Sequence, residues 1–387
     1  MPPRPGVLGR PWGPRPRVRT RPNGDATGGN AMTTILYAGR AAEPCHARAD
    51  AAGLWLPLAE LASVTGWERK PEGICRDEVC IAIPPGSAGA IFGGGTQFNL
   101  VEFARMIEQP WAADTAQDVW CFGDPGWEWK DRLAGGAAPD FALPDFTGVS
   151  HRLSDCRGSK VLLLCWASWC GCRLDLPIWS ALRDELHEQG FELLTVDCES
   201  KGIEVGRPFV EAAAPSHPSL FDGEHIVPAL FNTRNVPAAF WIDERGQIVR
   251  ANDPIYAQRR NQQTGETTTN TRYMDAVRDW VARGPASEFV RDAPGLDSVT
   301  APSWEHAQAT AHFRLGVALH HGGHPDAAIA QFKAAHALAP DNWNYRRQAY
   351  NLGRIKEDYG YETMREVIQD PSSPPFYRTV DIVNGAR

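Results

Sequence analysis

The sequence lacks any hydrophobic run long enough to cross a lipid bilayer. Its longest uninterrupted apolar run, residues 161–167, has seven residues, whereas a membrane-spanning helix needs about 18 or more. The N-terminal stretch also lacks the apolar core and the small-residue cleavage site of an export signal. We therefore predict a protein with no membrane span and a cytoplasmic location.

The sequence has no excess of positive charge beyond its first 30 residues. Those residues carry six arginines and one aspartate, which leaves 33 basic and 46 acidic side chains, a net charge of −13, for the rest of the chain. A nucleic-acid-binding function is therefore disfavoured. The arm at residues 1–30 is rich in Pro, Gly and Arg and cannot bury enough apolar surface to fold, so we predict that it is disordered.

The cysteines do not form the pattern of a disulfide framework. There are nine, an odd number, in a chain of 387 residues without an export signal. A hairpin would bring Cys75 and Cys80 together as a second redox pair, and a zinc site that adds Cys45 and Cys121 is an alternative. Because this spacing is not one of the known structural zinc spacings, we predict no bound metal. We also predict no organic cofactor.

The length of the chain leaves room for two or three domains. Residues 31–134 mix strand-like and helical patterns and are predicted to form a small α+β domain of unknown role. The segment Gly-Gly-Ala-Ala-Pro at residues 135–139 interrupts both helix and strand. A second domain is therefore predicted over residues 135–285, and a helical segment with its tail over residues 286–387.

Within residues 135–285, buried strands alternate with amphipathic helices, as in an α/β domain. The strands are predicted at residues 161–167 and 191–197, with a hairpin at 238–250, and the helices at residues 174–190 and 274–284. The polar residues 258–272 show no periodicity and are predicted to form a loop.

From Ala309 onward the pattern changes to paired helices. One set of residues has the spacing of a single tetratricopeptide repeat: Leu315, Gly316, Ala328, Phe332, Ala335 and Pro340. Residues 342–355 predict a following helix. Because a lone repeat cannot bury its own apolar face, we expect it to pack on the preceding domain or on a protein partner.

The segment WASWCGCR at residues 166–173 lies where a predicted buried strand passes into a helix. A thiol at this place meets unpaired backbone N–H groups and the positive end of the helix, which favour the thiolate. Cys170 is therefore a candidate nucleophile. Residues two apart in a helix point about 200° away from one another, so a disulfide to Cys172 needs a non-helical backbone, which Gly171 can supply. A strained bridge of this kind suits thiol exchange better than structural stapling.

Several motifs resemble, in the same order, those of the thioredoxin-like thiol-disulfide oxidoreductases related to TlpA and ResA, in the wider redoxin and AhpC/TSA grouping. The motifs are APDFALPDFTG, HRLSDCRGSKVLLLCWASWC, CRLDLP and NVPAAFWIDERGQIV, over about residues 137–284. The resemblance implies a thioredoxin-like fold and thiol or disulfide substrates. It makes Cys170 the attacking thiolate, Cys172 the resolving thiol and Trp169 a shield for the sulfurs.

The same resemblance makes Val236-Pro237 the family's cis-proline segment, which shapes the groove for the substrate thiol. The sequence departs from the family at two places. Only Gly171 separates the cysteines where the family has two residues, so the motif is C-x-C. The family's buried aspartate is replaced by Leu164. Asp175 and Glu192 could act instead, but we interpret both as solvated surface charges.

The remaining thiols are interpreted from their positions. Cys165, inside the apolar run, and Cys156 are predicted to be packed core residues. A peroxidase that uses Cys170 alone would need another resolving thiol, for which Cys198 is a candidate. The peroxiredoxin pattern is absent, because Leu163 and Ala167 stand where it has Pro and Thr.

We therefore predict a cytoplasmic thiol-disulfide oxidoreductase that uses Cys170 and Cys172 in cell redox homeostasis. Two alternatives remain at this point. One is the peroxidase, and the other is a non-catalytic adaptor whose C-terminal helices bind a protein partner. The predicted architecture is a central thioredoxin-like α/β fold, flanked by the small α+β domain and the helical segment.

Overall fold

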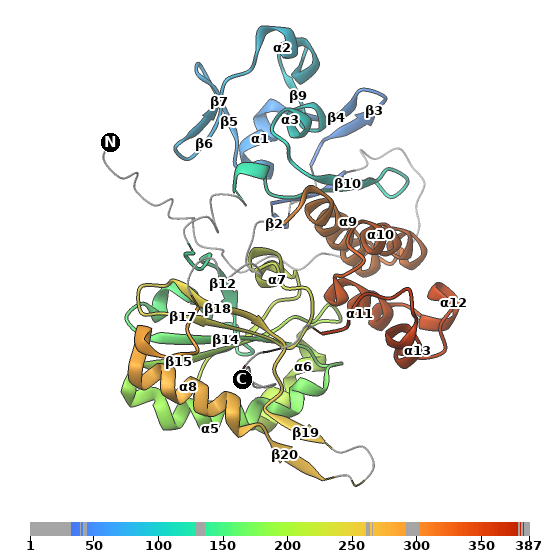
Figure 1. Ribbon diagram of the computed structural model, residues 1–387. Helices are drawn as coiled ribbons and strands as arrows, with labels where there is room; N and C mark the ends of the chain where they lie inside the picture. Colours follow the sequence, from blue (N-terminus) through green and yellow to red (C-terminus); the bar gives the residue numbers. More distant parts are fainter. Residues whose placement is uncertain are drawn as a thin grey trace.

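The computed structural model describes residues 32–38, 40–41, 45–128, 136–260, 264, 266–291, 302–377, 380 and 382. The predicted arm, residues 1–30, and Gly135 of the predicted boundary lie outside these residues. Figure 1 shows an N-terminal unit at the top, an α/β unit at the bottom, and C-terminal helices beside both. Among the described residues, no helix combines the length and the apolar character needed to cross a bilayer.

The N-terminal unit consists of three small sheets and short helices. The strand orders are β10-β11-β1-β2, β3-β4-β9-β8 and β5-β6-β7. The strands are β1 (Thr34–Tyr37), β2 (Arg40–Ala41), β3 (Arg48–Asp50), β4 (Gly53–Pro57), β5 (Glu68–Lys70), β6 (Gly73–Arg76), β7 (Val79–Ile81), β8 (Phe92–Gly93), β9 (Gln97–Asn99), β10 (Trp111–Asp114) and β11 (Val119–Phe122). The helices include α1 (Leu58–Thr65), α2 (Pro85–Ile91) and α3 (Leu100–Met106). Phe103 packs edge-on against Trp67 and Phe98 in the core.

The predicted hairpin around Cys75 and Cys80 is present, and its two cysteines form a disulfide. They are directly opposed on the antiparallel strands β6 and β7. The bridge removes both sulfurs from the zinc site that sequence analysis considered, while Cys45 and Cys121 are buried free thiols in separate hydrophobic clusters. The four cysteines therefore do not form one site.

The central unit is a five-stranded sheet in the order β16-β15-β14-β17-β18. Its strands are β14 (Lys160–Trp166), β15 (Phe191–Asp197), β16 (Ser219–Phe221), β17 (Ala238–Ile242) and β18 (Ile248–Asp253), and a separate pair is formed by β12 (Ala142–Pro144) and β13 (Ser150–Arg152). In β14, Leu163 is paired with Leu194 of the parallel strand β15 and with Phe240 of the antiparallel strand β17. The predicted strands are therefore present, and β14 lies at the centre.

Every residue of β14 after the first is apolar, and successive side chains of a strand point to opposite faces of the sheet. Helices therefore cover both faces of this sheet. Leu162 and Leu164 pack on one side with α5 (Leu176–Leu186) and α8 (Thr271–Arg283), which lie side by side in Figure 1. Leu163 packs on the other side, over α6 (Ile203–Ala213) and α7 (Ile226–Leu230). The 3-10 helices are η1 (Leu153–Cys156), η2 (Gly171–Asp175), η3 (His187–Gln189) and η4 (Gly284–Ala286).

The prediction of a loop over residues 258–272 is wrong. The segment contains the antiparallel strands β19 (Gln258–Arg260) and β20 (Thr267–Thr269), and α8 begins at Thr271. A two-stranded ribbon is held by backbone hydrogen bonds and needs no apolar periodicity, and threonine favours extended backbone. A search for hydrophobic patterns therefore misses it.

The C-terminal segment contains α9 (Trp304–His321), α10 (Pro325–Leu338), α11 (Trp343–Leu352), α12 (Ile355–Tyr359) and α13 (Met364–Gln369). α9 and α10 form a hairpin, and α9 also packs on β10 and β11 of the N-terminal unit. The side chain of Gln308 in α9 accepts a hydrogen bond from the backbone N–H of Trp111 at 2.8 Å. In α11, the N–H of Asn344 donates to the carbonyl of Arg234 in the α/β unit at 2.8 Å. The segment thus packs on both other units, while its repeat nature stays a prediction.

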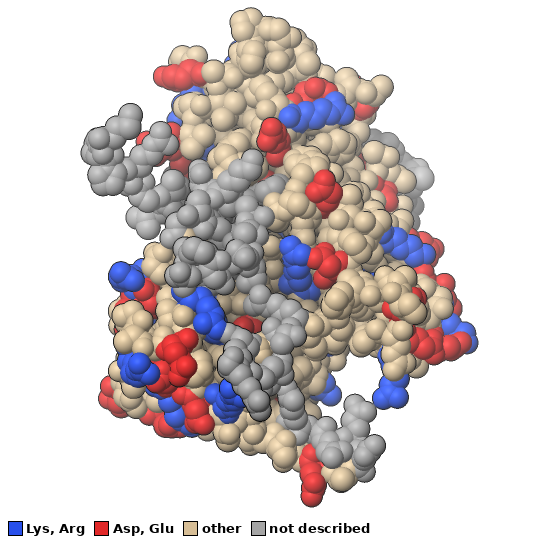
Figure 2. All heavy atoms as spheres, in the orientation of Figure 1, with Lys and Arg blue, Asp and Glu red and all other residues tan. Residues whose placement is uncertain are grey.

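Charged side chains of both signs are interspersed over the face shown in Figure 2. The protein also has exposed ion pairs, such as those of Arg278 with Glu185 and Asp275. Exposed pairs of this kind contribute little to stability, typically below about 1 kcal/mol. The fold is therefore held mainly by the buried apolar clusters.

Candidate functional site

Cys170 lies where the chain leaves the central strand β14 and enters a helical turn. β14 ends at Trp166, and η2 (Gly171–Asp175) leads directly into α5. Cys170 is extended, with φ −91° and ψ 142°, and its Sγ accepts a hydrogen bond from the N–H of Cys172 at 3.4 Å. The non-helical residue that a C-x-C pair requires is therefore Cys170 itself and not Gly171.

The sulfur of Cys170 is closed off from solvent. The residue is 0% exposed, and Cys172 is 3% exposed. The hydroxyl of Tyr256 lies 3.4 Å from the Cys170 Sγ, and the carbonyl oxygen of Val236 lies 3.7 Å from it. A substrate can reach this sulfur only when neighbouring side chains move aside.

The two thiols ionise very differently. Burial acts to raise the pKa of Cys170, but the Cys172 thiol, the positive charge of Arg347 and the hydroxyl of Tyr256 outweigh it and lower that pKa to about 5. Burial raises the pKa of Cys172 well above its usual value, and the neighbouring Cys170 raises it further. At neutral pH the pair therefore holds one thiolate, at Cys170, and one thiol, at Cys172.

The predicted shield, Trp169, and the two residues predicted to shape the substrate groove, Val236 and Pro237, lie beside these thiols. The Val236-Pro237 bond is cis and both residues are buried. Trp169 is half-buried and packs against the same hydrophobic cluster as Cys170 and Cys172. The structure therefore brings all five predicted site residues together.

Sequence analysis missed Arg347, which reaches the site from α11. Its Nη1 donates to the carbonyl of Val236 and to the Oδ1 of Asn235, both at 2.8 Å. Its guanidinium lies 4.1 Å from the ring centroid of Trp169. The sequence predicted a helix around Arg347, but no local pattern connects that helix with the cysteines.

Two tyrosines, also missed, complete the cover over the site. Tyr377, which follows α13, donates its hydroxyl hydrogen to the carbonyl of Val236 at 2.9 Å. Its hydroxyl oxygen also lies 2.9 Å from that of Tyr256. Burial raises the pKa of Tyr256, and the charge of Cys170 raises it further. Tyr256 therefore stays protonated and can donate its hydrogen to the thiolate.

Comparisons with known proteins match the part of the chain that carries this site. The AhpC/TSA family model matches residues 134–251. Thiol-disulfide oxidoreductase ResA of Geobacillus kaustophilus is 35% identical over 115 residues, which are 30% of this chain and 66% of that protein. Thioredoxin-like protein YneN of Bacillus subtilis is 33% identical over 117 residues, which are 30% of this chain and 68% of that protein.

The chain belongs to the thioredoxin-like proteins. A solved structure of a candidate thiol:disulfide interchange protein DsbE from Chlorobium tepidum has 32% sequence identity, and the match covers 30% of this chain and 82% of that one with a TM-score of 0.29. The chain spans 66% of the length of ResA, and most of its own length lies outside these matches. The match to the AhpC/TSA family model and the similarity to ResA and YneN confirm the predicted AhpC/TSA thioredoxin-like domain.

In this thioredoxin-like domain, the interpretation of Asp175 as a solvated surface charge is wrong. Asp175 is 1% exposed, and its Oδ2 accepts a hydrogen bond from the N–H of Ala257 at 2.9 Å. Within the described residues its Oδ1 has no hydrogen-bond partner. Burial raises the pKa of Asp175 to about 6, and the charge of Cys170 contributes to this rise. Asp175 is therefore a buried carboxyl group that responds to the charge of Cys170 and is a candidate proton acceptor for the thiol pair.

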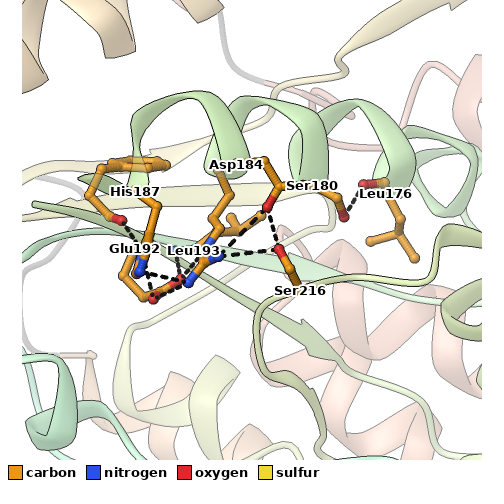
Figure 3. Close-up of polar contacts among 9 residues, drawn as sticks. Leu176, Ser180, Asp184, His187, Glu192, Leu193 and Ser216 are labelled. Atoms are coloured by element: carbon orange, nitrogen blue, oxygen red, sulfur yellow. Dashed lines mark hydrogen bonds and ion pairs between the residues drawn. The ribbon is translucent and has the colours of Figure 1, made fainter. Parts of the chain in front are cut away.

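Glu192, the other candidate, lies at the opposite end of the strands. In the register of β14 and β15 it is opposite Val161, whereas the end near the thiols pairs Trp166 with Asp197. Figure 3 shows Glu192 in a polar network with His187, and Arg183 donates to its carboxylate at 2.9 and 3.0 Å. Glu192 is thus a half-buried carboxylate in an ion pair. The interpretation as a solvated surface charge is therefore wrong for Glu192 as well as for Asp175.

The remaining cysteines of the domain lie in the apolar core. Cys165 is fully buried, as predicted, and the Cys198 thiol is within hydrogen-bonding reach of it. Burial, and then this neighbour, raise the pKa of Cys198 well above its usual value. Cys156 is half-buried against the same cluster. In the described part of the chain, no group of three or more His, Cys, Asp or Glu side chains is arranged to hold a metal ion.

Proposed function

We propose that this thioredoxin-like protein is a thiol-disulfide oxidoreductase, with Cys170 as the attacking thiolate and Cys172 as the resolving thiol. The observation that carries the proposal is the unequal pair: Cys170 has a pKa of about 5, and Cys172 stays protonated beside it. A thiolate is the nucleophile in disulfide exchange. Because Cys172 is protonated, its sulfur does not attack until Cys170 has formed the mixed disulfide.

The proposed cycle transfers two electrons. The Cys170 thiolate attacks one sulfur of a substrate disulfide, which forms a mixed disulfide and releases the first substrate thiolate. Cys172 then loses its proton and attacks the Cys170 sulfur, which releases the second substrate thiolate. The substrate disulfide is reduced to two thiols, and Cys170 and Cys172 become the disulfide. An external dithiol of the protein or small-molecule class reverses the oxidation.

Trp169, Val236 and Pro237 line the place where the substrate sulfur would approach. We propose that Trp169 shields and orients the two sulfurs, and that Val236 and Pro237 shape the groove for the substrate. The similarity to ResA, itself named a thiol-disulfide oxidoreductase, supports this assignment. The direction of electron flow in the cell depends on the reduction potential of the pair.

The experiment that tests this function is mass spectrometry of tryptic peptides from protein equilibrated over a series of glutathione redox potentials. The peptide from Val161 to Arg173 contains Cys170, Cys172 and the buried Cys165. We expect a reversible bridge between Cys170 and Cys172, while Cys165 stays a free thiol and serves as the internal control. If both site thiols stayed reduced at every potential, thiol-disulfide exchange at this site would be excluded.

Other outcomes of the same experiment point to the alternatives. Sulfenic acid at Cys170 after addition of hydroperoxide, with peroxide consumption that survives Cys172→Ser, would support the peroxidase. Inert thiols and an unchanged partner interaction in the double variant C170S/C172S would support the adaptor. Because α9 and α11 pack on this chain's own units, no observation favours the adaptor over the exchange reaction.

The cytoplasmic location and the domain limits at residues 30, 134 and 285 stay predictions. The disulfide between Cys75 and Cys80 is an observation against the location, because disulfides are rare in reducing compartments. Fractionation of native cells, followed by detection of the full chain, tests the location. Limited proteolysis tests the domain limits.

A further inference from the structure

Arg347 is held at the site by groups from the α/β unit and from the C-terminal tail. Its Nη1 contacts the carbonyl of Val236 and the side chain of Asn235, and it lies 3.4 Å from the hydroxyl of Tyr377. Its guanidinium also lies over the ring of Trp169. These directional contacts hold the long side chain of Arg347 in one orientation beside the site.

No carboxylate among the described residues is paired with Arg347 in an ion pair; its hydrogen bonds go to neutral oxygens. A half-buried guanidinium without a counter-anion is costly. The Val236 carbonyl oxygen that Arg347 contacts lies 3.7 Å from the Cys170 Sγ. Of the nearby negative charges, that of the Cys170 thiolate acts most strongly on Arg347 and raises its pKa against the effect of burial. Each charge therefore stabilises the other.

Apart from Arg173, the other groups that face Cys170 carry no positive charge. Cys172, Tyr256 and Tyr377 are uncharged at neutral pH because burial raises the pKa of each. Asp175 is either neutral or negative. Arg173 donates to the backbone carbonyl of Cys170 at 2.8 Å, and its guanidinium lies over the ring of Phe209.

We propose that Arg347 is a positioning residue that holds Cys170 as a thiolate, so that helix α11 of the C-terminal segment completes the site of the thioredoxin-like domain. This rests on the exchange function proposed above. In the reduced protein the guanidinium and the thiolate form a charge pair. When Cys170 enters a disulfide its sulfur becomes neutral and the pair is lost, so Arg347 favours the reduced state and makes the disulfide more oxidising.

The test measures the ionisation of Cys170 in the reduced full-length protein. The thiolate is followed by its ultraviolet absorbance across the acidic and neutral pH range, as the difference between each protein and the same protein with Cys170→Ser. We expect R347M to lower the ionisation constant of Cys170 at least about tenfold, because an opposite charge nearby shifts a pKa by about one to three units. R347K keeps the charge and should retain most of the effect.

The matched control is R346M. Arg346 precedes Arg347 on α11, and its guanidinium lies 4.5 Å from the ring centroid of Trp343, whereas that of Arg347 lies over Trp169 beside the thiols. R346M should leave the titration of Cys170 unchanged. If R347M does not fold, R347Q keeps a donor for the Val236 carbonyl without the charge and is evaluated in the same way.

Two results would overturn the proposal: neutral variants at position 347 that titrate like the wild type, or an equal shift in R346M. The measurement needs no substrate, so it separates this inference from the proposed function. A shifted titration in a protein whose thiols never exchange would remove the function and leave Arg347 as the partner of the thiolate. Reversible exchange with an unshifted titration would remove only the role of Arg347.

Discussion

At the scale of single residues, Asp175 shows how burial changes the pKa and the possible chemical role of a carboxyl group. Its sequence position, at the start of a helix, is typical of an exposed charge, yet the residue is 1% exposed and the N–H of Ala257, just before β19, donates to it. A carboxyl group with a pKa of about 6 can accept a proton near neutral pH. Cys172 must lose a proton before it can resolve the mixed disulfide.

We expect Asp175→Asn to slow the closure of the Cys170–Cys172 disulfide by on the order of a hundredfold at neutral pH, as for loss of a proton acceptor. In the wild type this rate should rise as the pH increases through about 6, where the carboxyl group ionises, and the variant should lack this rise. Rapid-mixing kinetics with a small disulfide at several pH values measure both. A rise that persists in the variant would assign the proton to another acceptor.

The same variant has a predictable effect on stability. The folded pKa of Asp175, about 6, lies above the usual value of 3.8, so the folded state holds this proton more tightly than the unfolded state. The carboxyl group therefore costs stability as the pH rises between these values. As the pH rises from 3.8 to about 6, the wild type should therefore lose up to about 3 kcal/mol in free energy of unfolding relative to D175N, which has no carboxyl group at this position. Urea denaturation at both ends of the window tests the sign.

At the scale of elements, the α9–α10 hairpin depends on the absence of a side chain at Gly316. A Cβ there would lie 2.5 Å from Cε1 of Phe332 on the facing helix. The missing side chain lets the two helices approach each other closely. The ribbon β19–β20 was missed because its pairing leaves no periodic apolar signal.

We expect Gly316→Ala to lower the free energy of unfolding by about 1–3 kcal/mol, because overpacking outweighs the better helix propensity of alanine. The matched control is Gly89→Ala in α2, where a Cβ would meet nothing within 4 Å. That substitution should raise stability by up to about 1 kcal/mol. Chemical denaturation of both variants and the wild type measures these changes in the free energy of unfolding. Equal effects at the two positions would show that the hairpin tolerates a wider spacing.

At the scale of the whole molecule, α11 joins the C-terminal segment to the thioredoxin-like domain through a buried side chain. The amide of Gln348 donates to the carbonyl of Cys198, and its oxygen accepts from the N–H of Ser200 at 3.2 Å. The residue is fully buried. Arg347, the next residue towards the N-terminus, is therefore positioned by an interface that lies outside the cysteine site.

We expect Gln348→Ala to cost about 2–4 kcal/mol in free energy of unfolding, because two buried backbone groups lose their partners. Amide hydrogen exchange should quicken over α11, and Cys170 should react faster with an alkylating agent. The control is Gln331→Ala in α10, whose side chain contacts His312 and the carbonyl of Ala113 in the N-terminal unit. It should leave α11 and Cys170 unchanged. Unaltered exchange over α11 in Q348A would show that other contacts dominate the interface.

The sequence by itself determined the features that depend on neighbouring residues. Apolar runs and helical periodicity identified the central strands and the two helices on one face of the sheet. The motif at residues 166–173 indicated the two thiols, and several motifs over residues 137–284 indicated the family. Only the tertiary structure decided what surrounds the thiols. Tyr256 is 86 residues from Cys170 in sequence, and Arg347 is 111 residues from Val236, to whose carbonyl it donates beside the Cys170 sulfur. Contacts at such separations arise from tertiary packing within and between units, which leaves no periodic trace in the chain.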